Sequence, residues 1–270
     1  MEINDSWQVT GFEEKPDQPR TIPGEDDLCL ASMGIYVFSS RFLYEQLLKD
    51  ANSKSSSRDF GKNIIPSVID THKVVAFPFA DKNNKKQAYW RDVGTIDSYY
   101  DANMDLVTVE PQLNMYDDVW PIRTDTGNYP PPKFVFGGDD IGRVGMATDS
   151  IVCPGSIISG GHVERSVIGP RVRVNSFANV QDSILFEEVQ VGRYSQIRRA
   201  IVDKGVIIPS GIQIGFDPEE DRRRGLLVSD SGIVVIGKGM PVARLSTDQS
   251  PGSKNVPSPH MRSSRVQARH

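Results

Sequence analysis

The feature of this sequence that most limits its fold is a spaced repeat of apolar residues. Between residues 152 and 214 these side chains fall into groups of three, with a step of six residues inside each group except for one step of five from Ile158 to Val163, and the groups repeat every 16 or 17 residues. Neither the 3.6-residue period of a helix nor the two-residue period of a simple strand produces this spacing. Three six-residue steps per turn are the hexapeptide pattern of a parallel β-helix.

The repeat predicts three columns of core side chains, each residue stacking on its counterpart one coil later. The columns are Val152, Ile168, Leu185 and Val202; Ile158, Val174, Val191 and Ile208; and Val163, Val180, Ile197 and Ile214. Glycines at 155, 160, 161, 169, 192 and 205 suit the corners, because glycine tolerates positive φ. Unrelated strands separated by turns are the alternative, but they would not keep this phase over four coils.

Ahead of the repeat, strand and helix signals alternate. The run 28–38, LCLASMGIYVF, is nearly continuously apolar and predicts a strand buried on both faces of an α/β sheet. Ser39 or Ser40 can cap a helix after it, and Thr95 can cap another. Residues 59–70 predict a helix interrupted at Pro66, and residues 74–79 another strand.

Four segments follow from these signals. They are a partial α/β domain over 1–107, a connector rich in Pro, Gly and Asp over 108–146, the β-helix over 147–236, and a disordered tail over 237–270.

Composition excludes several classes of protein. The 31 basic and 35 acidic residues give a net charge of −4, so no overall positive field favours nucleic acid or an anionic membrane. Two cysteines and four histidines are too few for a disulfide scaffold or a structural zinc site. The sequence shows neither a membrane-spanning run nor a signal peptide, so we expect a cytoplasmic protein.

Several strings resemble one family. They are FEEKP at 12–16, LASMGIYVF at 30–38, DFGKNIIP at 59–66, YWRDVGTIDSYYDANMDL at 89–106, YDDVWPIRT at 116–124, PPKFVF at 131–136, SVIGPRVRVNSF at 166–177 and RRAIVDKGVIIPSGIQIG at 198–215. Together they resemble bacterial glucose-1-phosphate adenylyltransferase. The resemblance implies a GT-A or Rossmann-like nucleotidyltransferase domain followed by a left-handed β-helix, which makes ADP-glucose and pyrophosphate from ATP and glucose 1-phosphate in glycogen biosynthesis. It also implies a homotetramer regulated by phosphorylated metabolites.

The sequence departs from the family by lacking the glycine-rich loop G-x-G-T-R that holds the nucleotide phosphates. We therefore expect a natural truncation or a fragment whose isolated chain is inactive.

The resemblance also assigns substrate-binding residues for glucose 1-phosphate. Lys15 matches the family lysine that holds the sugar phosphate, and Glu14 the carboxylate that accepts hydrogen bonds from glucose hydroxyls. The other matching positions are Ser32, Tyr36, Asp59, Phe60 and Trp90. Read without the family, Glu14 and Lys15 form a solvated turn, Asp59 caps a helix, and the aromatic residues pack in a core.

Asp92, in WRDVGT, is the predicted catalytic and metal-binding residue. Mg²⁺ is the expected cofactor, because it prefers a few carboxylate oxygens together with substrate phosphates and water. In the family a second aspartate, from the part missing here, shares the ion.

Six basic residues in the β-helix predict a site for anionic effectors, although a solvated face is an equal alternative. They are Arg171, Arg173, Arg193, Arg198, Arg199 and Lys204. The arginines at 222–224 are expected on the surface.

Two other functions stay open. One is a non-catalytic subunit in which the β-helix drives oligomerisation and binds anions, and the other is a related nucleoside-diphosphate-sugar pyrophosphorylase. A β-helix acyltransferase is a weaker alternative, since only His162 lies in the coils.

Overall fold

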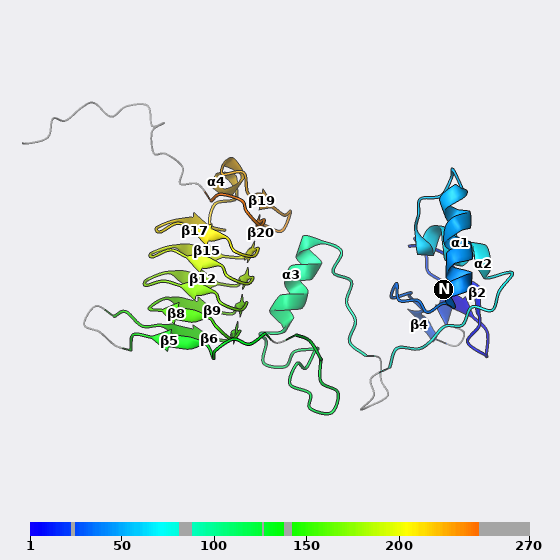
Figure 1. The fold of residues 1–270 in the computed structure, drawn as a ribbon, viewed down its shortest axis with the longest axis horizontal. Coiled ribbons are helices and arrows are strands. Elements are labelled where there is room, and N and C mark those ends of the chain that lie inside the picture. Colours follow the sequence, from blue (N-terminus) through cyan, green and yellow to red (C-terminus); the bar gives the residue numbers. More distant parts are fainter. Residues whose placement is uncertain (23–24, 81–87, 126, 138–141, 243–270) are drawn as a thin grey trace, which may run out of the picture. The chain divides into compact units, whose positions relative to one another are not determined.

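The computed structural model describes residues 1–22, 25–80, 88–125, 127–137 and 142–242. The chain divides into two compact units, residues 1–88 and 89–270 (Figure 1). None of the helices in the described ranges is both long and apolar enough to cross a membrane.

The first unit has little sheet. Its strands are β1 (Glu2–Ile3), β2 (Val9–Gly11), β3 (Thr21–Ile22) and β4 (Glu25–Cys29), and its helices are α1 (Ser40–Asn52), the π-helix η1 (Phe60–Ile64) and α2 (Ile65–Val68). The strands form two antiparallel pairs, β1 with β2 and β3 with β4. A small core forms where α2 and η1 bury Ile64, Ile65 and Val68, each at most 4% exposed.

The second unit contains helix α3 and a parallel β-solenoid. Its elements are α3 (Ile96–Asp105), β5 (Lys133–Val135), β6 (Met146–Thr148), β7 (Ile151–Val152), β8 (Ile157–Ser159), β9 (His162–Glu164), β10 (Val167–Ile168), β11 (Arg173–Val174), β12 (Asn179–Gln181), β13 (Ile184–Leu185), β14 (Gln190–Val191), β15 (Gln196–Arg198), β16 (Ala200–Val202), β17 (Ile207–Ile208), β18 (Gln213–Ile214), α4 (Pro218–Arg223), β19 (Leu227–Val228) and β20 (Val234–Ile236). We call the stack from β5 to β20 the solenoid.

The solenoid has three sheets. One contains β5, β8, β11, β14 and β17, the next β6, β9, β12, β15 and β18, and the third β7, β10, β13, β16, β20 and β19 (Figure 1). The pairing is parallel everywhere except between β19 and β20.

The register of these sheets confirms the predicted columns. Ile168 pairs with Val152 and Leu185, Val174 with Ile158 and Val191, and Val180 with Val163 and Ile197. Val174, Val180 and Val191 are completely buried. Because each such side chain contributes about 1.5–3 kcal/mol of hydrophobic free energy, the columns form the main core of the solenoid.

The solenoid extends beyond the boundaries expected from the repeat. Strand β5, inside the segment expected to be a connector, pairs with β8 and places Phe134 beside Ile158. After the last coil, Val242 is buried and Met240 packs against the core. The described start of the expected tail is therefore ordered, and its remainder, 243–270, lies outside the described residues.

The strand expected over 28–38 is wrong. β4 ends at Cys29, residues 30–38 form no strand, and the side chains of Ile35 and Val37 are 75% and 98% exposed. A strand buried on both faces needs neighbouring strands and covering layers, and the described part of this unit supplies only two-stranded sheets. The segment expected to form a strand at 74–79 likewise makes only one isolated bridge, between Val75 and Gln8.

The helix predictions are more accurate. α3 begins after Thr95, whose hydroxyl accepts a hydrogen bond from the Ser98 backbone N–H at 3.1 Å while the Ser98 hydroxyl accepts one from Thr95 N–H. The helix expected over 59–70 is in two parts, η1 and α2. Pro66 lies in the first turn of α2, where a backbone N–H has no partner within the helix, so its absence removes no hydrogen bond.

The end of the solenoid contains a buried ion pair that the sequence did not reveal. Asp221, only 1% exposed, accepts a hydrogen bond from Gly215 N–H at 2.8 Å and pairs with Arg224 at 3.4 Å. The side chain of Arg224 is 6% exposed, so the expectation that the arginines at 222–224 lie on the surface is wrong at this position. Burial raises the pKa of Asp221 despite these favourable contacts.

Candidate functional site

The first unit brings together five of the residues predicted to bind glucose 1-phosphate. The hydroxyls of Ser32 and Tyr36 lie 3.1 Å apart, and the Tyr36 ring stacks on Phe60 with ring centres 5.7 Å apart. Glu14 and Asp59 both approach Gly61, since a β-carbon at that position would lie 2.5 Å from Glu14 Oε2 and 3.4 Å from Asp59 Oδ1. Three segments distant in the sequence thus meet around the start of η1.

Glycine at position 61 is what allows Glu14 to come this close. A side chain at a 2.5 Å separation would force either the backbone or the carboxylate to move. Sequence reasoning did not single out Gly61, although it lies inside the DFGKNIIP string.

Asp59 has a structural role as well as a possible binding role. Its Oδ1 accepts a hydrogen bond from Lys62 N–H at 2.9 Å and so caps η1. The cap holds this carboxylate beside that of Glu14. Carboxylate oxygens have several lone pairs each and suit the hydroxyls of a polyol.

Lys15, which follows Glu14 in the sequence, has an unusual backbone conformation. Its φ is 48°, in the left-handed region, which a non-glycine residue adopts at a cost. Its side chain is exposed and forms no salt bridge within the described ranges. The ammonium group is therefore available to an anion.

The other two predicted residues, Trp90 and Asp92, belong to the second unit. Trp90 is 42% exposed, and Asp92 Oδ1 accepts a hydrogen bond from Gly94 N–H at 3.0 Å. This bond fixes the turn just before α3. Asp92 is exposed to solvent, so a metal ion could reach the carboxylate.

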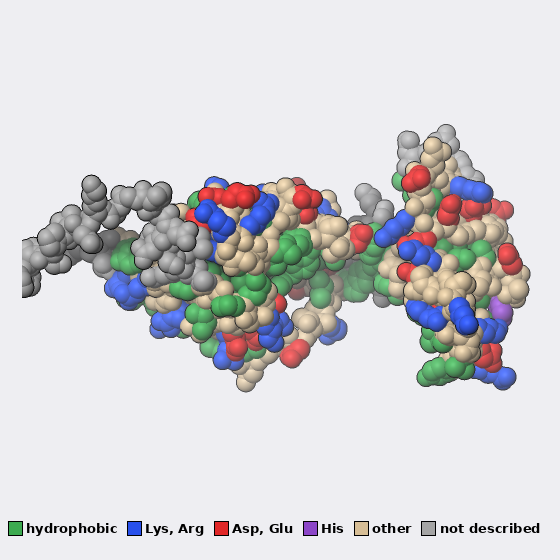
Figure 2. Space-filling model, turned by 90° about the horizontal axis from the view of Figure 1, so that it is seen from above, with side chains coloured by type: hydrophobic (Ala, Val, Ile, Leu, Met, Phe, Trp, Pro, Cys, Tyr) green, Lys and Arg blue, Asp and Glu red, His purple; other side chains and the backbone are tan. Residues whose placement is uncertain are grey.

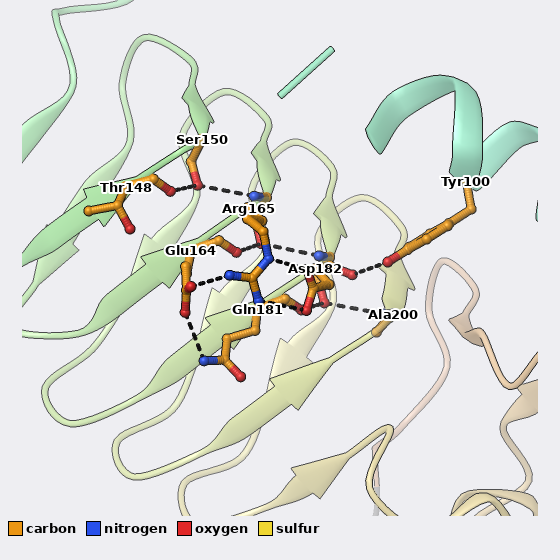
Figure 3. A network of polar contacts seen from close by, with 10 residues as sticks. Tyr100, Thr148, Ser150, Glu164, Arg165, Gln181, Asp182 and Ala200 are labelled. Carbon is orange, nitrogen blue, oxygen red and sulfur yellow. Dashed lines mark hydrogen bonds and ion pairs between the residues drawn. The ribbon is translucent and has the colours of Figure 1, made fainter. Parts of the chain in front are cut away.

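Helix α3 is held against the solenoid by contacts that Figure 3 shows in part. The Tyr100 hydroxyl donates to the Asp182 carbonyl at 2.6 Å (Figure 3), and the Arg199 guanidinium lies 5.7 Å from the centre of the Tyr100 ring. Burial raises the pKa of Tyr100. At the start of the helix, the hydroxyls of Ser229 and Ser231 donate to Asp97 Oδ1. The helix that follows the Asp92 turn is thus fixed to the solenoid.

The six basic residues predicted as an effector site do not form one cluster. Arg171 and Lys204 follow strands of the six-stranded sheet, Arg173 lies on β11, Arg193 follows β14, Arg198 ends β15 and Arg199 follows it. On the face shown in Figure 2, Lys and Arg side chains lie beside acidic ones at several places.

Several of these basic groups already have partners within the chain. Arg171 pairs with Glu188 at 3.1 Å, Arg198 lies over the Phe216 ring at 4.8 Å, and Arg199 donates to the Ser231 carbonyl at 3.1 Å. The effector role of any of the six residues stays a prediction.

A metal site is incomplete in the described part of the chain. No group of three or more His, Cys, Asp or Glu side chains is placed there to hold an ion. Asp92 could supply one carboxylate oxygen, and Mg²⁺ commonly takes its remaining ligands from water and substrate phosphates. The donor set fits Mg²⁺ only as a partial site.

Comparisons with known proteins agree with this arrangement. Residues 1–109 match the family model described as "Nucleotidyl transferase", and residues 130–236 match "GlmU-like, C-terminal hexapeptide". The chain therefore joins a nucleotidyltransferase segment to a hexapeptide solenoid.

Curated relatives share one name. A glucose-1-phosphate adenylyltransferase of Rhodopirellula baltica is 58% identical over 244 residues, covering 90% of this chain and 55% of the relative. Proteins of the same name from Shewanella sp. strain ANA-3 and Shewanella frigidimarina are 51% and 50% identical, covering 57% and 58% of their own lengths. The chain belongs to the glucose-1-phosphate adenylyltransferase family and spans little more than half the length of these relatives.

Proposed function

We propose that this chain supplies the glucose 1-phosphate half of a site that forms ADP-glucose and pyrophosphate from ATP and glucose 1-phosphate, in glycogen biosynthesis. The observation that carries the proposal is the meeting of Glu14, Ser32, Tyr36, Asp59 and Phe60 around η1. Homology over nine-tenths of the chain supports the same substrates.

The proposed reaction requires the enzyme to position the two substrates rather than to form a covalent intermediate. A phosphate oxygen of the sugar phosphate attacks the α-phosphorus of ATP, and pyrophosphate leaves. In this proposal Lys15 holds the sugar phosphate by a charge-assisted hydrogen bond, Glu14 and Asp59 accept from glucose hydroxyls, and the aromatic pair contacts the apolar face of the sugar. Trp90 provides a further aromatic surface.

Mg²⁺, when bound, would neutralise charge on the transferring phosphates. Asp92 would be its ligand from this chain. The turn stabilised by Gly94 and the anchored helix α3 hold that carboxylate in place.

The proposal extends to assembly and regulation. We infer a homotetramer with the solenoid as an assembly surface, and phosphorylated metabolites as effectors. Both inferences rest on the family and on the solenoid's exposed basic residues. The two free cysteines, Cys29 and Cys153, are consistent with the cytoplasm as the expected location.

The test is equilibrium binding of glucose 1-phosphate to the purified chain, with Lys15→Ala as the variant and Lys73→Ala as a matched control at another exposed lysine. Losing one charge-assisted contact should cost roughly 1.5–3 kcal/mol, or about 10- to 150-fold in affinity. The control should bind like the unaltered chain. If both variants bind equally well, or if Lys15→Ala weakens ATP as much as glucose 1-phosphate, Lys15 has another role.

A turnover assay tests the other half of the proposal. The chain with ATP, glucose 1-phosphate and Mg²⁺ should form no ADP-glucose above a no-enzyme control, because no motif for the nucleotide phosphates is present in its sequence. Clear turnover would show that the chain contains a complete site. Product formed instead from dTTP or GTP would favour a related pyrophosphorylase.

A further inference from the structure

The first unit contains a second polar hollow, separate from the residues around Glu14 and Tyr36. Its volume is about 450 Å³, within the range typical of small-molecule sites, and it lies between α1 and the η1–α2 segment. The lining residues include two amides, Gln46 and Asn63, and one lysine, Lys49. Hydroxyl-bearing side chains make up much of the rest.

Gln46 is the residue that points to a ligand. It is the one buried residue of α1, only 7% exposed, and its side-chain amide makes no hydrogen bond among the described residues. Among the described residues, Arg224 Nε is the only fully enclosed side-chain nitrogen or oxygen that lacks a hydrogen-bond partner. The amide of Gln46 is therefore not fully enclosed and remains open to solvent. With no partner in the described part of the chain, this amide can form hydrogen bonds with a ligand in the hollow.

The contacts around the hollow leave mainly donors unused. Asn63 Oδ1 already accepts from the backbone N–H groups of Ser57 and Asp59 at 3.2 Å, whereas no hydrogen bond from its Nδ2 is found in the described ranges. Lys49 likewise has no ion-pair partner there. Two amide groups and one ammonium therefore remain to donate.

The negative groups near the hollow are largely neutralised. Asp50 accepts a hydrogen bond from the Ser56 hydroxyl and lies 3.6 Å from the Arg58 guanidinium. Arg58 also donates to the carbonyls of Asp50, Ala51 and Ser53, which form the negative end of the α1 dipole. Lys49 is left as a net positive charge.

From this surplus of donors we propose that the hollow binds a small phosphate monoester that carries hydroxyl groups. A phosphate presents three acceptor oxygens, which suit Lys49 together with the two amides. Ser53, Ser55 and Ser67 line the same hollow, and hydroxyl-bearing side chains suit the hydroxyls of the ligand.

The experiment titrates the full chain with glycerol 3-phosphate, inorganic phosphate and uncharged glycerol, following heat and the side-chain amide signals of ¹⁵N-glutamine. Gln46→Leu and Lys49→Met should each weaken glycerol 3-phosphate at least tenfold, whereas Lys54→Met, outside the hollow, should change affinity less than twofold. Gln46→Leu should melt no lower than the unaltered chain, because leucine fills similar space without an unpaired amide. Glycerol alone should bind at least tenfold more weakly than its phosphate.

Several results would overturn the inference. These are no binding to the unaltered chain, unchanged binding in Gln46→Leu, or an equal loss in Lys54→Met. The Lys15→Ala chain separates this site from the proposed glucose 1-phosphate site, since it should retain glycerol 3-phosphate binding at the hollow. If that variant loses all phosphate binding while Gln46→Leu keeps it, this inference fails and the proposed function stands.

Discussion

The two units of this chain differ in whether they bury the apolar residues that the sequence predicts to lie in strands. In the solenoid, side chains with strong β propensity are stacked in columns and buried, as Val174 and Val191 are. In the first unit, the equally apolar Ile35 and Val37 are exposed. A buried strand therefore depends on what lies beside it, and the solenoid supplies a neighbouring coil above and below each of its inner strands.

This contrast has a simple origin in connectivity. Among strands β6 to β18, paired residues lie 16 or 17 positions apart in the sequence, as Val174 does from Ile158 and Val191. A central strand of an α/β sheet needs partners and covering helices from distant parts of a domain. The solenoid is therefore self-sufficient over short stretches, whereas the first unit is not.

The largest expected effect tests the solenoid core directly. Val191→Asp would bury a carboxylate in the middle of a completely buried column, with Val174 and Ile208 on either side. We expect a loss of several kcal/mol in the free energy of unfolding, on the order of 4 or more, measured by thermal or chemical denaturation. The solenoid should fail to fold.

The neighbouring substitution Gln190→Asp is the control, because Gln190 is exposed on the same strand. It should change the free energy of unfolding by only about 0.5 kcal/mol. Equal stability of the two variants would contradict the register, since a shift by one residue exchanges their positions.

The next effect concerns a serine ladder at one corner of the solenoid, in which the hydroxyls of Ser150, Ser166 and Ser183 each accept a hydrogen bond from a backbone N–H one coil later. Ser183, completely buried, donates to the Gln181 carbonyl at 2.6 Å and accepts from Ala200 N–H at 3.2 Å. Ser183→Ala should destabilise the solenoid by about 1–3 kcal/mol, because the buried Ala200 N–H loses its partner. Denaturant unfolding followed by circular dichroism would measure it.

The sequence contains its own control for this substitution. Ala200 occupies the equivalent corner one coil later, so an alanine fits there sterically. Wild-type stability for Ser183→Ala would mean that the ladder hydrogen bonds contribute nothing net.

A smaller effect is expected where α3 joins the solenoid. Tyr100→Phe removes the hydrogen bond to the Asp182 carbonyl but keeps the ring, which is 5% exposed. We expect a loss of about 1 kcal/mol and faster amide hydrogen exchange in residues 96–105. Unchanged exchange in α3 would show that apolar packing alone holds the helix.

The smallest effect on stability should come from the first unit. Ile35→Ser and Val37→Ser replace exposed apolar side chains, so the free energy of unfolding should change by about 0.5 kcal/mol or less. Binding of a hydrophobic dye should fall. A large destabilisation would instead place these side chains in a core and remove the contrast between the units.

Much of the candidate site could be predicted from the sequence, although by resemblance rather than by periodicity. The family strings identified Glu14, Ser32, Tyr36, Asp59 and Phe60, and the structure places these residues together. The close approach of Glu14 to position 61 was not predicted, because backbone proximity between distant segments leaves no periodic signal.

The solenoid could be predicted from the sequence alone, since a six-residue repeat specifies which side chains face inward and which residues stack, and each coil needs only its neighbours. The start of α3 could be predicted in the same way, because the bonds between Thr95 and Ser98 are local. Three other outcomes follow from contacts between distant segments: residues 30–38 remain outside any strand, the six basic residues lie apart, and Arg224 is buried against Asp221. Each of these outcomes depends on partners far away in the sequence, and the free energy of burying a strand or a charge is set by those partners rather than by local preference.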